Sequence, residues 1–323
     1  DPHPGRIDPL SIVLSMATMV PIVFAIKEAA VHGFGVTVPL LVVLGLGFGV
    51  LFVRRQLRLE TPMLDMRLFS LGTFTGALLV NLLSVIALVG FLFFVAQHLQ
   101  LIVGLTPMDA GLALVPGMVA MIIAGLAVVP VAQRVDARIV VPVGLAFSTA
   151  GYVMVALSAT DADLTLLIWA FVLLGIGIGA AETVSNDLIL SSAPPQKAGA
   201  ASAVSETAYE LGAVLGTAVL GGILTSLFRT GMVLPEGITG SLADAARETL
   251  AGAMNVADQL GGAVGDQLRA AAAHAFDSGV VVTALVGAGL VVIAAVIAAT
   301  TLRTTPTNEE SDVARHQTGP DPR

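Results

Sequence analysis

The sequence contains no cysteine, and only 12% of its 323 residues are charged. Without thiols the chain forms no disulfide, offers no thiolate nucleophile and builds no cysteine-based metal site. It also lacks a Gly-x-x-x-x-Gly-Lys-Ser/Thr loop, which excludes nucleotide hydrolysis of the P-loop kind. The five histidines show no metal-ligand spacing, and no nucleophile stands beside a base. We therefore expect no cofactor, no metal and no enzymatic activity.

Basic residues are scarce as well. The 15 Lys and Arg residues stand against 23 Asp and Glu residues, which gives a formal net charge of −8. No basic patch is present, so we expect no nucleic-acid partner. Hydrophobic residues, in contrast, make up 56% of the chain. A chain so apolar and so poor in charge needs a lipid bilayer as its solvent.

The hydrophobic residues are gathered in long blocks. A helix needs about 20 mostly apolar residues to cross about 30 Å of hydrocarbon. Unpaired strands would leave backbone groups unsatisfied in lipid, so helices are predicted. Blocks of this length cover approximately residues 10–30, 36–53, 73–96, 110–132, 139–157, 164–190, 200–228 and 280–302. We predict an all-α membrane protein with about eight transmembrane helices.

The basic residues between the blocks predict the orientation. If the C-terminus lies in the cytoplasm, most basic residues on the extracytoplasmic side fall in one long loop. Charge in such a loop has little influence on topology. The cytoplasmic side then holds Arg6, Arg54, Arg55, Arg58, Arg67, Arg134, Arg138, Lys197 and Arg303. We predict a multi-pass protein of the inner (plasma) membrane with both chain ends in the cytoplasm.

The connections suggest three parts. Residues 1–70 hold a cytoplasmic start, two spans and the basic-apolar stretch Arg54 to Phe69, which favours an interfacial helix over a plain loop. Residues 71–303 hold six spans and a long extracytoplasmic loop at 229–278. Its stretches 241–254 and 263–276 form either short amphipathic helices or an unstructured acidic loop. Residues 304–323 are polar and proline-containing, typical of a disordered cytoplasmic tail.

Three carboxylates lie inside neighbouring apolar blocks. Glu182 belongs to the sixth block, Glu206 and Glu210 to the seventh, and a Pro194-Pro195 turn joins the two. An ionisable group inside the bilayer costs at least about 2.5 kcal/mol and usually marks a pathway, relay or pairing site. Helical rise from the turn puts Glu182 and Glu206 at similar depth. Glu206 and Glu210 share a helix face, and like charges so close favour a bound proton.

The alternative for these carboxylates is a structural tie to backbone, Asn186 or Ser202, or access to water at the cytoplasmic end. Asn186 and Asp187 lie nearer that end, where they suit either a helix cap or a gate. Tyr209, between the two glutamates, is a further candidate for the cavity wall.

Aromatic residues have two interpretations, whereas a row of small residues has one. Phe91, Phe93 and Phe94, with Asn81 and Ser84 earlier in the same block, suit a pocket for flat aromatic cations, or else packing in the core or against lipid. Ala208, Gly212 and Gly216 recur at four-residue spacing, which favours tight helix packing.

Several motifs resemble the fourteen-span drug/proton antiporters of the major facilitator superfamily. They are Gly5-Arg-Ile-Asp-Pro9, Pro62-Met-Leu-Asp-Met-Arg-Leu-Phe69, Gln97-His-Leu-Gln-Leu-Ile-Val-Gly104 with Ala110-Gly-Leu-Ala-Leu-Val-Pro116, and Gly199-Ala-Ala-Ser-Ala-Val-Ser-Glu-Thr-Ala-Tyr-Glu-Leu-Gly212. The resemblance implies a C-terminal six-helix bundle of the major facilitator fold, preceded by two central linking helices. The family's N-terminal six-helix bundle would be missing, which fits the loop-like start at Asp1.

The same resemblance implies proton-driven efflux of amphipathic cationic drugs by alternating access. Glu206 matches a family position with an acidic residue, so the resemblance gives it a proton or cation role. Proton uptake on Glu206, helped by Glu182 or Glu210, would release the drug outside. Two alternatives stay open, namely export of a native lipid, siderophore or peptide, and a non-transporting membrane sensor or assembly protein.

Overall fold

A computed structural model describes residues 8–32, 35–59, 62, 66–158 and 164–302, and in this part of the chain all regular structure is helical. Among the described residues, seven helices are long and apolar enough to cross a membrane. They are α2 (Thr37–Gln56), α3 (Gly72–Gln97) continued by η2 (His98–Ile102), α4 (Pro107–Ala132), α5 (Ala137–Ser158), α6 (Leu164–Ser191), α7 (Ala198–Leu215) continued by η4 (Gly216–Gly221) and α8 (Gly222–Gly231), and α11 (Gly262–Thr301). The helix α1 (Pro9–His32) has a shorter apolar stretch, Pro9–Ala25. The predicted all-α membrane fold is confirmed.

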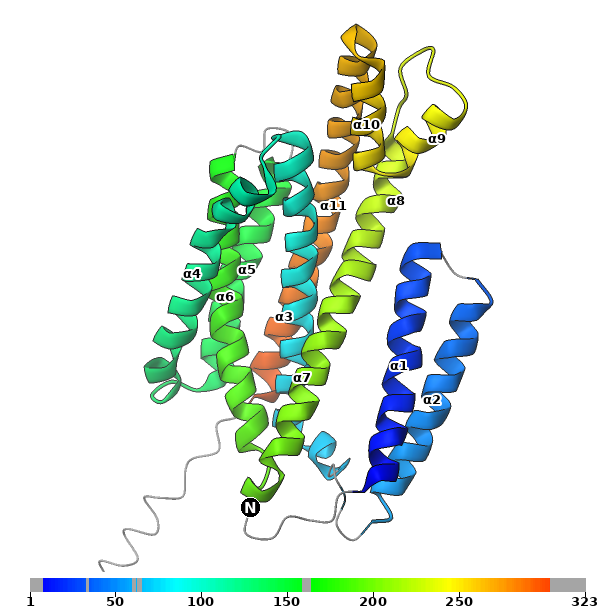
Figure 1. Cartoon of the computed structure of the whole chain (residues 1–323). Helices are drawn as coiled ribbons and strands as arrows, with labels where there is room; N and C mark the ends of the chain where they lie inside the picture. The colour runs from blue at the N-terminus through cyan, green and yellow to red at the C-terminus, as the bar shows by residue number, and fades with distance from the viewer. Residues whose placement is uncertain (1–7, 33–34, 60–61, 63–65, 159–163, 303–323) are drawn as a thin grey trace, which may run out of the picture.

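The seven candidate spans and α1 divide into a bundle of six and a hairpin of two. Figure 1 shows α3, α4, α5, α6, α7–α8 and α11 side by side in one bundle, while α1 and α2 form a hairpin beside it. Within the bundle, α6 packs on α3, α4 and α5, and α11 packs on α3, α5 and α8. The hairpin helices pack mainly on each other, and α1 touches α7 and η4. This is the predicted arrangement of a six-helix bundle with two additional helices.

Glycines let α6 approach two neighbours at once. A Cβ on Gly175 would lie 2.6 Å from the carbonyl oxygen of Gly117 in α4, and one on Gly179 would meet the carbonyl of Met121. A Cβ on Gly177, which faces the other way, would meet the carbonyl of Gly144 in α5. Such backbone-to-backbone contact is how helices associate in lipid, where burial of apolar surface gives little drive. Glycines at every second position therefore let α6 pack closely against α4 on one side and α5 on the other.

The small residues of α7 and η4 pack against α3. A Cβ on Gly212 would lie 2.9 Å from Cβ of Val85, and one on Gly216 would lie 2.7 Å from the carbonyl oxygen of Ile86. Ala208 is buried in the same row. The prediction that this four-residue spacing serves packing is confirmed.

An ion pair joins the two ends of the hairpin. The guanidinium of Arg55, in the last turn of α2, donates two hydrogen bonds of 3.0 Å to the carboxylate of Asp8, directly before α1. Hydrogen bonds from Arg55 and from Ser11 hold the pKa of Asp8 well below its usual range. The amide of Gln56 donates to Ser11 Oγ at 2.7 Å, so α1 and α2 are tied side by side at this end.

The segment expected as a long loop is mostly helical. It contains α9 (Ser241–Glu248), α10 (Leu250–Leu260) and the start of α11, which together form a cap beyond one end of the bundle in Figure 1. The expected helix over 241–254 is interrupted at Thr249, whose hydroxyl caps α10 by accepting from Gly252 N at 3.0 Å. The expected helix over 263–276 is the first third of α11, because α11 continues without a break into its span. The alternative of an unstructured loop is wrong.

Two other expectations fall partly or wholly outside the described residues. Arg54 and Arg55 belong to α2 rather than to a separate interfacial helix, because α2 continues to Gln56, and Met66–Ser70 forms the short 3-10 helix η1. Residues 60–61 and 63–65 lie outside the described part of the chain, as do the start at 1–7 and the predicted tail at 304–323.

We predict that Gly175→Ala destabilises the bundle, because the new methyl group meets the backbone of α4 and forces α4 and α6 apart. Overpacking of this kind costs about 1–3 kcal/mol. Thermal unfolding of the purified protein in detergent measures the effect. Gly111→Ala in α4 is the matched control, since a Cβ there meets nothing within 4 Å. Equal melting temperatures for the two variants would contradict the prediction.

Candidate functional site

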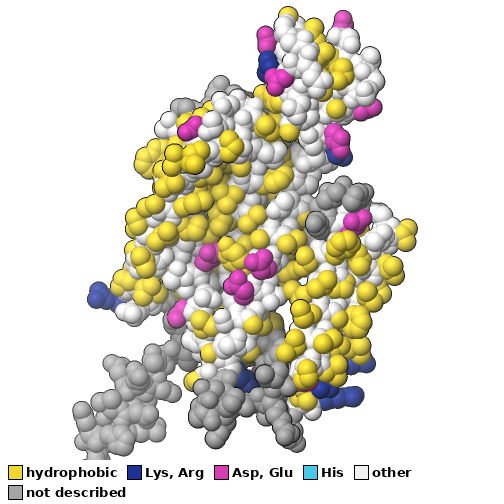
Figure 2. All heavy atoms as spheres, viewed as in Figure 1, with side chains coloured by type: hydrophobic (Ala, Val, Ile, Leu, Met, Phe, Trp, Pro, Cys, Tyr) yellow, Lys and Arg dark blue, Asp and Glu magenta, His cyan; other side chains and the backbone are white. Residues whose placement is uncertain are grey.

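The acidic residues of α6 and α7 lie on one face of the bundle. Figure 2 shows acidic side chains, in magenta, grouped at mid-height over these two helices, with apolar surface around them. The acidic residues of these two helices are Glu182 and Asp187 in α6 and Glu206 and Glu210 in α7. Glu182 is half-buried, whereas the other three are exposed. We call this group the acidic face.

Three of these carboxylates act electrostatically on one phenol. The hydroxyl of Tyr209 lies within electrostatic reach of Glu182, Glu206 and Glu210. The two helices are antiparallel and joined by a short turn that contains η3 (Pro195–Lys197), so residues equally far from the turn come to equal depth. Glu182 and Glu206, which the sequence placed at similar depth, therefore lie on adjacent helices, and both are within electrostatic reach of Tyr209.

A polar bridge lies directly behind this face. Asn81 Nδ2 in α3 donates to Ser205 Oγ in α7 at 3.3 Å, and Ser205 Oγ donates to Asn186 Oδ1 in α6 at 2.9 Å. Asn81 and Ser205 are buried, while Asn186 is exposed. The bridge connects three helices at the depth of the carboxylates. In this conformation the side chain of Asn186 is held by Ser205.

Sequence reasoning missed Ser205, although a signal was available. Ser205 belongs to the row of small buried residues Ala201, Ser205, Ala208 and Gly212, which recur at spacings of three and four along α7 and bury against the bundle. A hydroxyl in such a row faces a neighbouring helix and needs a partner there.

The phenylalanines of α3 do not reach the acidic face. Phe94 is 1% exposed, and its ring lies 5.0 Å from that of Phe91, which stacks on Phe171 of α6 and meets Tyr152 of α5 edge-on. The hydroxyl of Tyr152 donates to the carbonyl of Ala87. These rings fill the interior of the bundle, so the core interpretation holds for Phe91 and Phe94 and the open-pocket interpretation of Phe94 is wrong in this structure.

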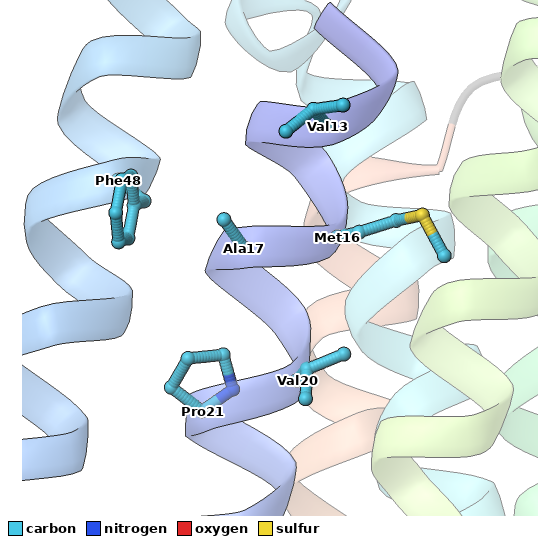
Figure 3. A pocket seen from close by; sticks show the side chains of 6 residues that line it. All are labelled: Val13, Met16, Ala17, Val20, Pro21 and Phe48. Carbon is cyan, nitrogen blue, oxygen red and sulfur yellow. The ribbon is translucent and has the colours of Figure 1, made fainter.

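A shallow cavity of about 380 Å³ lies elsewhere, on the hairpin. Figure 3 shows that its lining is entirely apolar, and that Met16 and Val20 extend from α1 on the side away from Phe48 of α2. The other lining residues are Val13, Ala17 and Pro21. This hollow offers no polar group to orient a ligand, so the acidic face is the candidate site.

Comparison with known proteins assigns the family. The model of the Major Facilitator Superfamily matches residues 33–217, more than half of the chain. The chain belongs to the Major Facilitator Superfamily. As a member of this transporter family with seven helices that could span the membrane, it is a multi-pass membrane protein of a transporter class rather than an enzyme class.

Three relatives carry names that refer to drug export or resistance. The chain is 48% identical over 303 residues to the multidrug efflux pump LfrA of Mycolicibacterium smegmatis, covering 94% of this chain and 60% of LfrA. It is 34% identical to the methyl viologen resistance protein SmvA of Salmonella typhimurium, covering 70% and 46%. It is 30% identical to the tetracenomycin C resistance and export protein of Streptomyces glaucescens, covering 72% and 43%. The chain thus spans about half of the length of these curated relatives.

Solved structures agree on the fold. A bacterial homolog of the human lysosomal transporter Spinster, in an inward-facing and occupied conformation, matches with a TM-score of 0.56 and 19% identity over 92% of this chain and 69% of that one. The unoccupied form matches with a TM-score of 0.55 and 15% identity, covering 91% and 71%. At these identities the likeness concerns the fold alone.

We predict that Ser205→Ala lowers stability by about 1 kcal/mol, because it removes both hydrogen bonds of the bridge and leaves the buried amide of Asn81 unpaired. Ser202→Ala, three residues earlier and exposed, serves as the control and should leave stability unchanged. Chemical or thermal unfolding in detergent compares the two. A Ser205→Ala protein as stable as the control would show that the bridge contributes nothing.

Proposed function

We propose that this chain is part of a proton-driven exporter of amphipathic cationic drugs that works by alternating access. The observation that carries the proposal is the acidic face, where Glu182, Glu206 and Glu210 lie within electrostatic reach of Tyr209 on two helices of a transporter fold. Negative charge in an apolar environment favours a flat or hydrophobic cation over a neutral solute. The names of the relatives support drug export, and methyl viologen is itself a flat aromatic dication.

The acidic face needs a second wall to form a cavity. We infer that residues 71–303 are the C-terminal bundle and that residues 1–70 supply the two linking helices. The opposite wall is then an N-terminal six-helix bundle outside this chain, and the length of the relatives leaves room for one. The drug would bind between the two bundles, as in other transporters built from paired repeats.

The distribution of basic residues supports the proposed orientation. Figure 2 shows Lys and Arg side chains, in dark blue, at the lower ends of the membrane helices and on the cap, whereas the surface between is mainly apolar. The lower end includes Arg54 and Arg55 of α2 and the turn between α4 and α5. By the positive-inside rule this end lies in the cytoplasm, with both chain ends, and the cap lies outside the inner membrane.

Competition between charges would couple the two fluxes. A proton taken up on Glu206, with Glu182 and Glu210 nearby, lowers the negative charge that holds the cationic drug and so releases it to the outside. Asp187, exposed and closer to the proposed cytoplasmic end, would meet the drug on entry. Each proton that enters gains about 2.3 kcal/mol per 100 mV and about 1.4 kcal/mol per pH unit. A monovalent cation that leaves costs the same electrical free energy, so a one-for-one exchange is driven by the pH gradient alone and gives about a tenfold drug gradient per pH unit.

We predict that Glu206→Gln in the complete transporter reduces ethidium efflux driven by a pH gradient by about tenfold or more, the scale of a coupling free energy between two ligands. The amide keeps the size of the side chain but carries no exchangeable charge. Efflux is followed by ethidium fluorescence in vesicles with an imposed gradient.

Glu236→Gln is the matched control, because Glu236 is exposed and precedes the cap helices. Wild-type efflux by Glu206→Gln would refute the proposed role of Glu206. Absence of any flux in the wild type, with ethidium or with a lipid, siderophore or peptide, would favour a non-transporting function instead.

A further inference from the structure

The membrane span that carries Glu206 and Glu210 is interrupted near its middle by a π-helical turn. The turn is η4 (Gly216–Gly221), which separates α7 from α8. Figure 1 shows the three elements in line, from the lower end of the bundle up to the cap. A π-helical turn inside a longer helix is rare and frequently marks a functional site. The turn divides this span into a lower helix, α7, and an upper helix, α8.

Two threonine hydroxyls, one in the turn and one after it, bond to the backbone of the same span. Thr217 Oγ1 donates to the carbonyl of Ala213 at 3.2 Å, and Thr225 Oγ1 donates to the carbonyl of Gly221 at 2.9 Å. Such bonds compete with the backbone hydrogen bonds of a helix and often bend it. The backbone on both sides of η4 is therefore easier to bend than that of a regular helix.

The glycine directly after the turn is not required by packing. A Cβ on Gly222 would meet nothing within 4 Å, whereas one on Gly216 would lie 2.7 Å from the carbonyl oxygen of Ile86. Glycine weakens a helix relative to alanine because its backbone has more conformational freedom. Since no neighbour needs the space at Gly222, this freedom favours bending at the end of the turn.

The two halves of the span have different neighbours. The helix α7 packs on α3 and α6, whereas α8 packs on α11 and on α9 of the cap. Arg229 Nε of α8 donates to the carbonyl of Glu248 in α9 at 3.1 Å, which fixes the upper half to the cap. The turn itself rests on α3, where the side chain of Leu220 occupies the place that a Cβ on Gly90 would take. This contact provides a pivot between the halves.

The charge lies on the lower half alone. Glu206 and Glu210 belong to α7 and are exposed, while α8 has no acidic residue. The hydrogen bonds of Ser205 to Asn81 and Asn186 hold α7 in the position seen here. A change of charge on the two glutamates therefore acts below the turn, and two hydrogen bonds oppose the movement of α7.

We propose that η4 is a hinge about which α7 pivots against α3, while α8 stays fixed to α11 and the cap. The trigger, a proton or cationic drug at Glu206 or Glu210, rests on the proposed function. The hinge differs from rigid rotation of a whole bundle, which leaves every distance inside the bundle unchanged. It moves the acidic face relative to the other helices of its own bundle.

Distances between spin labels test the hinge in the complete purified transporter. The chain has no cysteine, so introduced cysteines are the only labelled sites in it once any cysteine of the N-terminal bundle has been replaced by serine. Ser202→Cys with Ile139→Cys joins α7 to the lower end of α5. Thr230→Cys with Leu157→Cys joins α8 to the upper end of α5. All four side chains are exposed.

Electron–electron double resonance measures both distances at acidic and at alkaline pH, with and without ethidium. The distance from Ser202 to Ile139 should shift by several ångströms, because α7 moves. The distance from Thr230 to Leu157 should stay the same, because α8 does not.

Variants locate the movement at η4. Gly222→Ala stiffens the helix without a clash, so it should reduce the shift and lower ethidium efflux severalfold while the melting temperature stays equal or rises. Gly289→Ala in α11 is the matched control, since a Cβ there also meets nothing within 4 Å. It should keep both the shift and the efflux. The double variant Thr217→Val/Thr225→Val removes the two side-chain bonds and should also reduce the shift.

The outcomes separate the hinge from the proposed function. A shift of the lower pair alone that Gly222→Ala reduces supports the hinge. Equal shifts of both pairs, no shift in a wild type that exports ethidium, or a shift unchanged in Gly222→Ala and in the double threonine variant overturns it.

A wild type without any flux refutes the proposed function instead. The hinge is then judged by the widths of the two distance distributions. The distribution for the lower pair should be the broader one and should narrow in Gly222→Ala, and equal widths would overturn the hinge.

Discussion

Direct backbone contact along α6 is the constraint on which the rest of this bundle depends. Gly175 and Gly179 bring α6 against α4, and Gly177 brings it against α5. In lipid, where hydrocarbon surrounds every helix, such close packing supplies the free energy of helix association that the hydrophobic effect supplies in water. Glu182 follows within one turn of Gly179, so its position is set by the same contacts. The glycines thus hold a costly carboxylate at a fixed depth.

The polar groups of α3, α6 and α7 form layers. The outermost layer is the acidic face, and behind it Ser205 joins Asn81 to Asn186. Deeper still lie the rings of Phe91, Phe171 and Tyr152. In the proposed mechanism, a proton or drug changes the charge of the first layer, and the hydrogen bonds of the second layer connect the helices that carry it. A change of charge would then act on whole helices rather than on single side chains.

Much of this architecture was predictable, for a physical reason. Lipid requires long apolar segments and penalises a carboxylate within them, whatever helices lie next to them. The spans and Glu182, Glu206 and Glu210 therefore stand out in the sequence. Serines do not stand out, because a hydroxyl in a helix costs little and finds many partners. Phe94 was ambiguous for a related reason. Phenylalanine is stable both on a lipid-facing surface and in the core of a bundle, and hydropathy does not distinguish these two environments.

The cap was harder to predict, because its helices follow from local details. Thr249 ends one helix and caps the next, and nothing between Phe276 and Val280 stops α11. Alanine-rich segments outside lipid show only weak periodicity, so their boundaries depend on such single residues.

The unbroken α11 has a mechanical consequence. Its 40 residues make a rod of about 60 Å, about twice the thickness of the hydrocarbon layer. Inside the bundle, α11 packs closely against α5 where Gly287 contacts the ring of Tyr152. One continuous helix therefore connects the cap directly with the aromatic core of the bundle.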